Sequence, residues 1–392
     1  MERIKSEFAN KVEIITPDDG YHYFFAYYDM RATGDGINQN HLCHRVKFMD
    51  RLPTKDDVCE IGYLKDKKFY KIGETTAWNF QQGAMLQYHP FKENTVYYNV
   101  VKDGKFTTVT HNFETGEKSY TDMATACVSP DGKYGLSVNF GRIFAFRPGY
   151  GYAGYKDEFE NVNVPDKDGV FLTDMESGKS KFLVSYKDML EESGFTEDDK
   201  ILVNHITFNT TSDKYIMLVR NFQKPGGGLW ATSMMVGDLN GNVKTVRLKT
   251  FVSHYYWISS NEILVVCNVN KEKEVWNLYV INVDDCSYTE YDSFYYHIKG
   301  CSPDIHCSIT PDGKYFMGDG YPFEGYRGIL VTEIATLKSK VILWAKTEAE
   351  EWGDIRCDLH ARYVFNGKYV SFDTIHNDKR EIAIFPIEEV KV

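Results

Sequence analysis

Residues 306–315 read His306-Cys307-Ser308-Ile309-Thr310-Pro311-Asp312-Gly313-Lys314-Tyr315, a polar start followed by an alternating stretch and a tight turn. Pro311 presets φ for the first central position of a turn, and Asp312-Gly313 supplies a side-chain acceptor and a positive φ. The chain then continues as the apolar Phe316-Met317. Apolar alternation on both sides of such a turn predicts a β-hairpin.

This pattern recurs along the chain with drifting sequence. Clear copies start at Thr125 and His360, weaker ones start at Gln87, His205 and His254, and the poorest lies near Tyr27. The last four starts are 49, 52 and 54 residues apart (254 − 205, 306 − 254 and 360 − 306), and 392 residues divided by seven give 56. Repeats of this length suit four-stranded blades arranged around an axis. The sequence predicts an all-β fold, a seven-bladed β-propeller of mostly four-stranded antiparallel blades that spans residues 1–392.

One interval between repeats is too long. The copies at Thr125 and His205 are 80 residues apart (205 − 125), about one and a half repeat units. We therefore expect an inserted loop region at about 148–200, with a helix at 186–192, that projects from the third blade. A role over the functional face and a purely decorative role are both open.

Composition and charge narrow the classes of function. The net charge is −11, with 45 basic and 56 acidic residues, which argues against nucleic acid as a partner because backbone binding needs concentrated Lys and Arg. No apolar run approaches the length of a membrane span. Residues 1–8 lack the apolar core of a secretory signal, so we expect a cytoplasmic protein with no membrane partner.

Histidines gather at one position of the repeat. The first position of the unit holds Gln87, Thr125, His205, His254, His306 and His360. Equivalent positions on successive blades lie on a ring around the axis, so four imidazoles are expected to face one space. Neutral imidazole is both a common metal ligand and the usual general base near neutral pH. A purely structural role, with each ring bonded to a neighbouring blade, is the alternative.

Two of these histidines are each preceded by a carboxylate. Asp304 lies two residues before His306, and Asp358 lies two residues before His360. Two imidazoles and a carboxylate, here His306, His360 and Asp358, can bind a divalent metal such as Mn²⁺, Zn²⁺ or Ca²⁺ with open positions. The carboxylates can alternatively orient the imidazoles.

Arginines and tyrosines are expected beside this ring. Arg142, Arg147, Tyr150 and Tyr152 stand close together in the segment 140–152, and Arg220 follows the strand that begins near His205. Arginine suits bidentate recognition of carboxylates, so this group predicts an anion-recognising mouth. For each single arginine, a salt bridge within or between blades is the alternative.

Several segments resemble the propeller-type polysaccharide lyases, the group of oligogalacturonate lyase, with ulvan lyases as more remote relatives. The resemblance spans roughly residues 20–385, as a pattern and not as one strong motif. The segments that carry it are Trp78-Asn79-Phe80-Gln81-Gln82-Gly83-Ala84-Met85-Leu86-Gln87, Arg147-Pro148-Gly149-Tyr150-Gly151-Tyr152, Asp304-Ile305-His306-Cys307-Ser308-Ile309-Thr310-Pro311-Asp312-Gly313-Lys314 and Arg356-Cys357-Asp358-Leu359-His360.

The resemblance implies β-elimination on a uronate-containing saccharide. In that family His and Gln side chains hold a metal that grips the uronate, a separate His abstracts the C5 proton, and an Arg assists. By position, His306 and His360 look like metal ligands and His254 looks like the base. Asp358 departs from the family by standing near its third ligand His, and the family's Gln has no clear counterpart next to His360.

The remaining candidates take their roles from the same resemblance. In ulvan-type relatives a His and a Tyr serve as base and acid, so His205, Tyr150 and Tyr152 stay candidates, with Arg220 as the assisting cation. Arg142, Arg147, Tyr150 and Gln87 are expected to bind substrate.

The leading functional hypothesis is a lyase acting on an acidic oligosaccharide. The alternative is a non-catalytic propeller that binds a saccharide or a protein at the same mouth. A glycosidase needs two inward carboxylates, whereas the ring position carries His, so that class is disfavoured.

Overall fold

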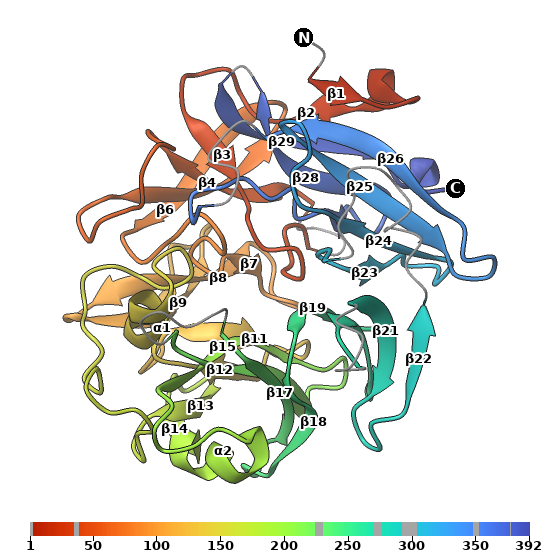
Figure 1. Ribbon diagram of the computed structural model, residues 1–392. Coiled ribbons are helices and arrows are strands. Elements are labelled where there is room, and N and C mark those ends of the chain that lie inside the picture. Colours follow the sequence, from red (N-terminus) through yellow and green to blue (C-terminus); the bar gives the residue numbers. More distant parts are fainter. Residues whose placement is uncertain are drawn as a thin grey trace.

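The computed structural model describes residues 3–34, 39–223, 230–269, 276–291, 304–347, 353–376 and 378–392. Within these ranges the strands form seven antiparallel sheets, six of four strands and one of five. The sheets follow one another around a central axis, and the chain colours in Figure 1 run once around the ring. The predicted seven-bladed β-propeller is therefore confirmed.

Each of the first five blades is made from four consecutive strands. Blades one and two comprise β3 (His22–Phe24), β4 (His41–Val46), β5 (Cys59–Lys65), β6 (Lys68–Thr75), β7 (Gln87–Tyr88), β8 (Thr95–Lys102), β9 (Lys105–Asn112) and β10 (Lys118–Tyr120). Blades three to five comprise β11 (Thr125–Val128), β12 (Tyr134–Ser137), β13 (Gly169–Asp174), β14 (Ser180–Ser185), β15 (Ile201–Phe208), β16 (Lys214–Asn221), β17 (Thr232–Asp238), β18 (Val243–Thr250), β19 (Val252–Trp257), β20 (Glu262–Cys267), β21 (Asn277–Asn282) and β22 (Tyr288–Tyr291).

The two ends of the chain meet in the last two blades. Blade six holds β23 (Ser308–Ile309), β24 (Tyr315–Asp319), β25 (Tyr326–Glu333) and β26 (Ser339–Lys346), with β1 (Ile4–Lys5) added to β26. Blade seven holds β27 (Arg362–Val364), β28 (Tyr369–His376) and β29 (Lys379–Pro386), with β2 (Glu13–Ile14) paired to β29. Figure 1 shows the first strands beside the last ones. This pairing closes the ring and covers two sheet edges.

Strands near the axis are more deeply buried than strands at the outer edge of a blade. The second strand of blade four, β16, is buried from Tyr215 to Arg220 on both faces, because neighbouring blades cover each face. In the outer strand β6, only Thr75 is buried. The apolar clusters therefore lie between adjacent blades. Apolar packing does not explain the polar side chains that are buried near the axis.

The extra residues of blade three form two separate segments. The first, 138–168, joins β12 to β13 and contains α1 (Phe140–Phe146). The second follows β14 and contains α2 (Tyr186–Ser193), which begins at a Ser185 capping box and ends at Gly194 in the left-handed conformation. The expected single insert of about 148–200 is thus corrected, since β13 and β14 inside it are ordinary blade strands. The helix expected at 186–192 is present.

Among the described residues, no helix has the length and apolar character to span a membrane.

Candidate functional site

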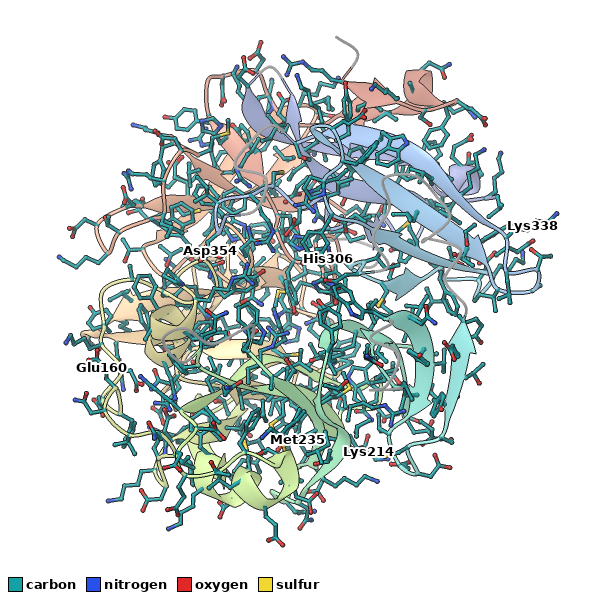
Figure 2. The ribbon with its side chains drawn as sticks, viewed as in Figure 1. Glu160, Lys214, Met235, His306, Lys338 and Asp354 are labelled. Carbon is teal, nitrogen blue, oxygen red and sulfur yellow. The ribbon has the colours of Figure 1, made fainter. Side chains whose placement is uncertain are left out.

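A cavity of about 500 Å³ opens near the axis of the propeller. Its walls are built from cations, aromatic rings and two of the expected histidines. They include Arg147, Tyr150, His205, Arg220, Trp230, Thr232, Phe251, Val252, Ser253, His254, Trp276, Asp304, Tyr321 and Arg356. Figure 2 shows His306 and Asp354 near the centre of the molecule, with Lys214, Lys338 and Glu160 at the rim.

The four histidines of the repeat converge as expected. All of them line one small cavity of about 10 Å³, which shares Tyr150, His205, Ser253 and His254 with the larger one. The ring centroids of His254 and His306 lie 4.0 Å apart, and those of His306 and His360 lie 4.3 Å apart. Two blade-one tyrosines, Tyr27 and Tyr28, also line this space.

The backbone turns these side chains toward the axis. His205 has a φ of 60° at a β-bulge between Asn204 and Ile206, and His360 has a φ of 45°. A non-glycine residue in this region is strained, and such strain concentrates at functional sites.

The spacing between the site residue and the hairpin turn corrects the repeat position expected for Gln87. His205 lies four residues before Asn209, the residue at which the blade-four turn begins. In blade two the turn begins at His89, whose Nδ1 accepts from the next turn residues, and four residues earlier stands Met85 with a φ of 54°. Gln87 instead lines a separate cavity with Asp29, Arg31 and Trp257, and it does not reach the histidine cavity.

Carboxylates orient two of the imidazoles. His254 Nδ1 lies 2.9 Å from Asp304 Oδ1, and His306 Nδ1 lies 3.2 Å from Asp319 Oδ1. This contact favours the proton on Nδ1, so that Nε2 is the acceptor in the neutral form of each ring. Burial lowers the pKa of His254, and the nearby His306 lowers it further, so that His254 is neutral near neutral pH.

His205 is oriented by neutral groups. Its Nδ1 lies 3.0 Å from Tyr27 Oη and 3.3 Å from Gln82 Nε2. Burial and the positive charge of Arg220 lower its pKa well below the usual imidazole range. His205 is therefore a neutral imidazole that lines both cavities.

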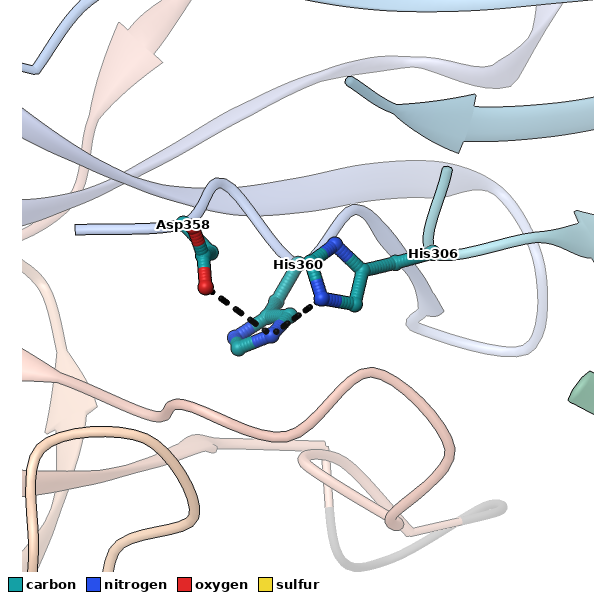
Figure 3. A group of neighbouring side chains, drawn as sticks. All are labelled: His306, Asp358 and His360. Carbon is teal, nitrogen blue, oxygen red and sulfur yellow. Dashed lines mark hydrogen bonds and ion pairs between the residues drawn. The ribbon is translucent and has the colours of Figure 1, made fainter. Parts of the chain in front are cut away.

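Asp358 lies between arginines and a histidine. Arg327 Nη2 lies 2.8 Å from its Oδ1, and Arg356 Nη2 lies 2.8 Å from its Oδ2. The same Oδ2 is 4.0 Å from His360 Nε2, which in turn is 3.2 Å from His306 Nε2, as Figure 3 shows. Two guanidiniums already compensate this carboxylate.

Arg220 carries a buried charge that contacts no carboxylate of a described residue. It is 5% exposed, and its guanidinium donates only to neutral oxygens, at Asn204, Thr232 and Val252. No carboxylate oxygen of a described residue lies within 4.0 Å of it. Burial lowers its pKa to about 10, which leaves it protonated at neutral pH. A buried uncompensated charge is costly, so this wall of the cavity favours an anionic ligand.

The segment that follows α1 reaches across to blade seven. Arg147 Nε lies 2.9 Å from Asp354 Oδ1, and Gly149 N donates to Asp354 Oδ2 at 3.0 Å. Arg356 Nη2 donates to the Tyr150 hydroxyl at 2.7 Å. Arg147 and Tyr150 are therefore placed in the cavity wall, as expected from the sequence.

Two expected site residues lie in the core instead. Arg142 is 0% exposed, pairs with Asp157 at 2.9 Å, and donates to main-chain carbonyls that hold the first inserted segment of blade three in place. Tyr152 is also 0% exposed, stacks on Phe140, and accepts from Asn99 Nδ2. The predicted substrate-binding role of Arg142 and catalytic role of Tyr152 are corrected, because neither side chain lines the cavity.

The donor set around His306 and His360 fits a divalent cation. The two Nε2 atoms face each other across 3.2 Å, and Asp319 occupies the Nδ1 of His306. His306, Asp358 and His360 offer ligand atoms that all lie within 4.8 Å of one another. A third acceptor in the same small cavity, Gln81 Oε1, is buried and has no hydrogen-bond partner among the described residues.

Several residues of the site were not singled out from the sequence. Gln81 and Gln82 lie in the quoted segment 78–87, where only the terminal Gln87 was chosen. The pair Tyr27-Tyr28 belongs to the poorest repeat copy, in which the site position could not be assigned from the sequence. Asp319 and Arg327 follow the blade-six hairpin, and no local pattern marks them. Trp230, Trp276 and Tyr321 come from connections between strands.

The fold and this site define a seven-bladed propeller with a cationic, histidine-lined cavity near its axis. No family model and no curated protein matches the sequence. Among solved structures, the chain is similar to an oligogalacturonate lyase in complex with manganese, with 15% identity over 97% of this chain and 94% of that one, and a TM-score of 0.65. It is also similar to an oligogalacturonate lyase from Vibrio parahaemolyticus, with 14% identity over 100% and 97% of the two chains, and a TM-score of 0.67.

Other propellers are similar over smaller parts of larger proteins. A tricorn protease matches with 11% identity and a TM-score of 0.54, over 97% of this chain and 34% of that one. At these identities the likeness shows the fold alone, the propeller fold of oligogalacturonate lyases. The chemistry therefore has to be argued from the cavity.

Proposed function

We propose that this protein is a lyase that cleaves a uronate-containing saccharide by β-elimination. The observation that carries the proposal is the pairing of two features in one cavity. Arg220 is a buried guanidinium that pairs with no carboxylate of the described residues, and His254 is a neutral imidazole that Asp304 orients. A uronate supplies both the missing anion and a carbon acid beside it.

The reaction needs a base for the C5 proton. His254 Nε2 takes this proton, the C–H electrons form the C4=C5 double bond, and the C4–O bond breaks with its electrons going to oxygen. A guanidinium on the carboxylate stabilises the enolate-like transition state, usually the largest contribution in such reactions. A positioned base adds roughly 10²–10⁴-fold.

The leaving oxygen needs a proton. Tyr150 is suited to supply it, because its oxygen accepts from Arg356 Nη2 and its own proton is left to donate. His205 is the second candidate for this step, since it lines the same cavity. Trp230 and Trp276 give the cavity flat apolar walls of the kind that pack against sugar rings.

We propose His306 and His360, with Asp358 beside them, as the site of a divalent cation. When bound, such a cation polarises a carboxylate oxygen as a Lewis acid. Asp319 holds the His306 ring so that Nε2 faces His360. Arg327 and Arg356 hold the Asp358 carboxylate in place.

The test is a panel of uronate oligosaccharides, followed by the absorbance of the unsaturated product in the near ultraviolet. The wild-type protein should form product with at least one uronate, with or without added Mn²⁺. His254→Gln should lower turnover by about 10²–10⁴-fold while retaining binding, and the matched control His22→Gln should behave as wild type. Because burial lowers the pKa of His254, the acid-side fall in kcat/KM should lie below the usual imidazole range.

The alternative, a non-catalytic saccharide-binding propeller, predicts a different result. Binding would then occur with no product from any uronate, and His254→Gln would have no turnover to lose.

A further inference from the structure

Gln81 is held in a single orientation by the main chain of another blade connection. Its side chain is 1% exposed, and Nε2 donates to the carbonyl oxygens of Asp354 at 3.2 Å and Arg356 at 3.0 Å. Two carbonyls can face only the nitrogen of the amide, so the positions of nitrogen and oxygen in Gln81 follow from these contacts. Its Oε1 must point the other way.

That oxygen is an acceptor without a donor. Oε1 is buried and has no hydrogen-bond partner among the described residues. Leaving a buried acceptor unsatisfied costs roughly 1–3 kcal/mol, so an additional group is expected beside it. Gln81 lines the small cavity of about 10 Å³ together with His306 and His360, and a space of this size holds one water or one ion.

Two imidazole nitrogens with lone pairs lie in the wall of the same space, from His306 and His360. Asp319 occupies His306 Nδ1, which leaves Nε2 as a lone pair directed at His360 Nε2, 3.2 Å away. Asp358 Oδ2 lies 4.0 Å from the same His360 nitrogen. Lone pairs of two imidazoles and an amide line one small space, and a carboxylate lies behind them. A cation matches these acceptors better than a water does, because a water can donate only two hydrogen bonds.

We propose that Gln81 Oε1 is a direct ligand, with His306 Nε2 and His360 Nε2, of a divalent cation in this cavity. The assignment rests on the metal part of the proposed function and adds a ligand from a different blade connection. Arg327 and Arg356 already compensate Asp358, so that carboxylate serves as a nearby counter-charge. A mixed set of imidazole and neutral oxygen donors suits Mn²⁺.

This ligand would also join distant parts of the ring. Gln81 belongs to the connection between blades one and two, whereas His306 and His360 precede the first strands of blades six and seven. A cation bound to all three would therefore link the first blades to the last ones beside the axis. Metal binding should then raise the melting temperature of the whole propeller.

The test is titration of the metal-free protein with Mn²⁺, followed by calorimetry and by the rise in melting temperature. Gln81→Leu should weaken Mn²⁺ binding at least tenfold. A crystal structure of the Mn²⁺-loaded wild-type protein should show Gln81 Oε1 bonded directly to the ion. The matched control Gln87→Leu, a glutamine in the separate cavity, should leave the affinity unchanged.

The Mn²⁺-loaded structure separates a ligand from a positioning residue. A purely positioning role also predicts weaker binding in Gln81→Leu, but it leaves Gln81 Oε1 outside the coordination shell of the ion, and that result would overturn the proposal. A wild-type protein that binds no Mn²⁺ would overturn it as well. Tight binding without lyase activity would contradict the proposed reaction and leave the ligand assignment standing.

Discussion

Individual buried charges divide into those that hold the fold and those that face the cavity. Arg142 and Arg220 are both almost fully buried arginines, and their sequence contexts look equally suited to anion binding. Arg142 has Asp157 as its partner, whereas Arg220 donates only to neutral oxygens. The difference between them is the presence of Asp157, 15 residues after Arg142 in the same inserted segment, and no local pattern marks it as the partner.

Arg220→Ala should therefore lower kcat/KM by about 10²–10³-fold and leave stability unchanged or higher, because it removes an uncompensated buried charge. The matched control Arg142→Ala should lose about 3–5 kcal/mol of stability, since it leaves Asp157 buried without its partner. Thermal unfolding and steady-state kinetics of both variants check this. If Arg220→Ala is as unstable as Arg142→Ala and keeps its activity, Arg220 is structural.

Among the elements, the loop between blades one and two packs closely against His44 at Gly83. Gly83 has a φ of 61°, and a Cβ placed there would lie 2.2 Å from His44 Cε1. His44 Nε2 accepts from Ala84 N at 2.9 Å, which ties the loop to blade one. Gln81 and Gln82 are positioned by this loop, so its conformation controls part of the site.

Gly83→Ala should lower stability by about 2–4 kcal/mol, from the positive φ together with the clash against His44. Gly104→Ala is the matched control, with a φ of 77° and open space around the added carbon, and it should lose only about 1–2 kcal/mol. Denaturant unfolding of the two variants measures the difference. Equal losses of stability in the two variants would show that the His44 contact does not contribute to the loss.

The sequence places the repeat position correctly in blade six and wrongly in blade two. Turns with Pro-Asp-Gly placed the histidines of blade six correctly, because Pro311 and Gly313 fix where the turn lies. In blade two the turn has no Asp-Gly pair and His89 takes the role of the turn-starting residue. The site position of blade two is Met85, two residues before the expected Gln87. A shift of two residues preserves the inside–outside alternation of a strand. The hydrophobic pattern could not reveal it.

At the scale of the whole molecule, the repeat count decided the architecture. Seven units of similar length can close on themselves, and the pairing of β2 with β29 completes the last blade. The same architecture also occurs in proteases, as the likeness to a tricorn protease shows. The fold could thus be predicted from spacing and turns. The proposed reaction depends on side-chain contacts such as those of Asp319 and Arg220, which join different strands or the segments beside them and which no turn or spacing marks.

The central claim is that the cavity cleaves by elimination. Mass spectrometry of the products from a uronate oligosaccharide in ¹⁸O-labelled water tests this most directly. The account predicts two products whose masses sum to that of the substrate, with no label incorporated and one product unsaturated. Products that together gain one labelled water would show hydrolysis, and a full uronate panel left intact would contradict catalysis altogether.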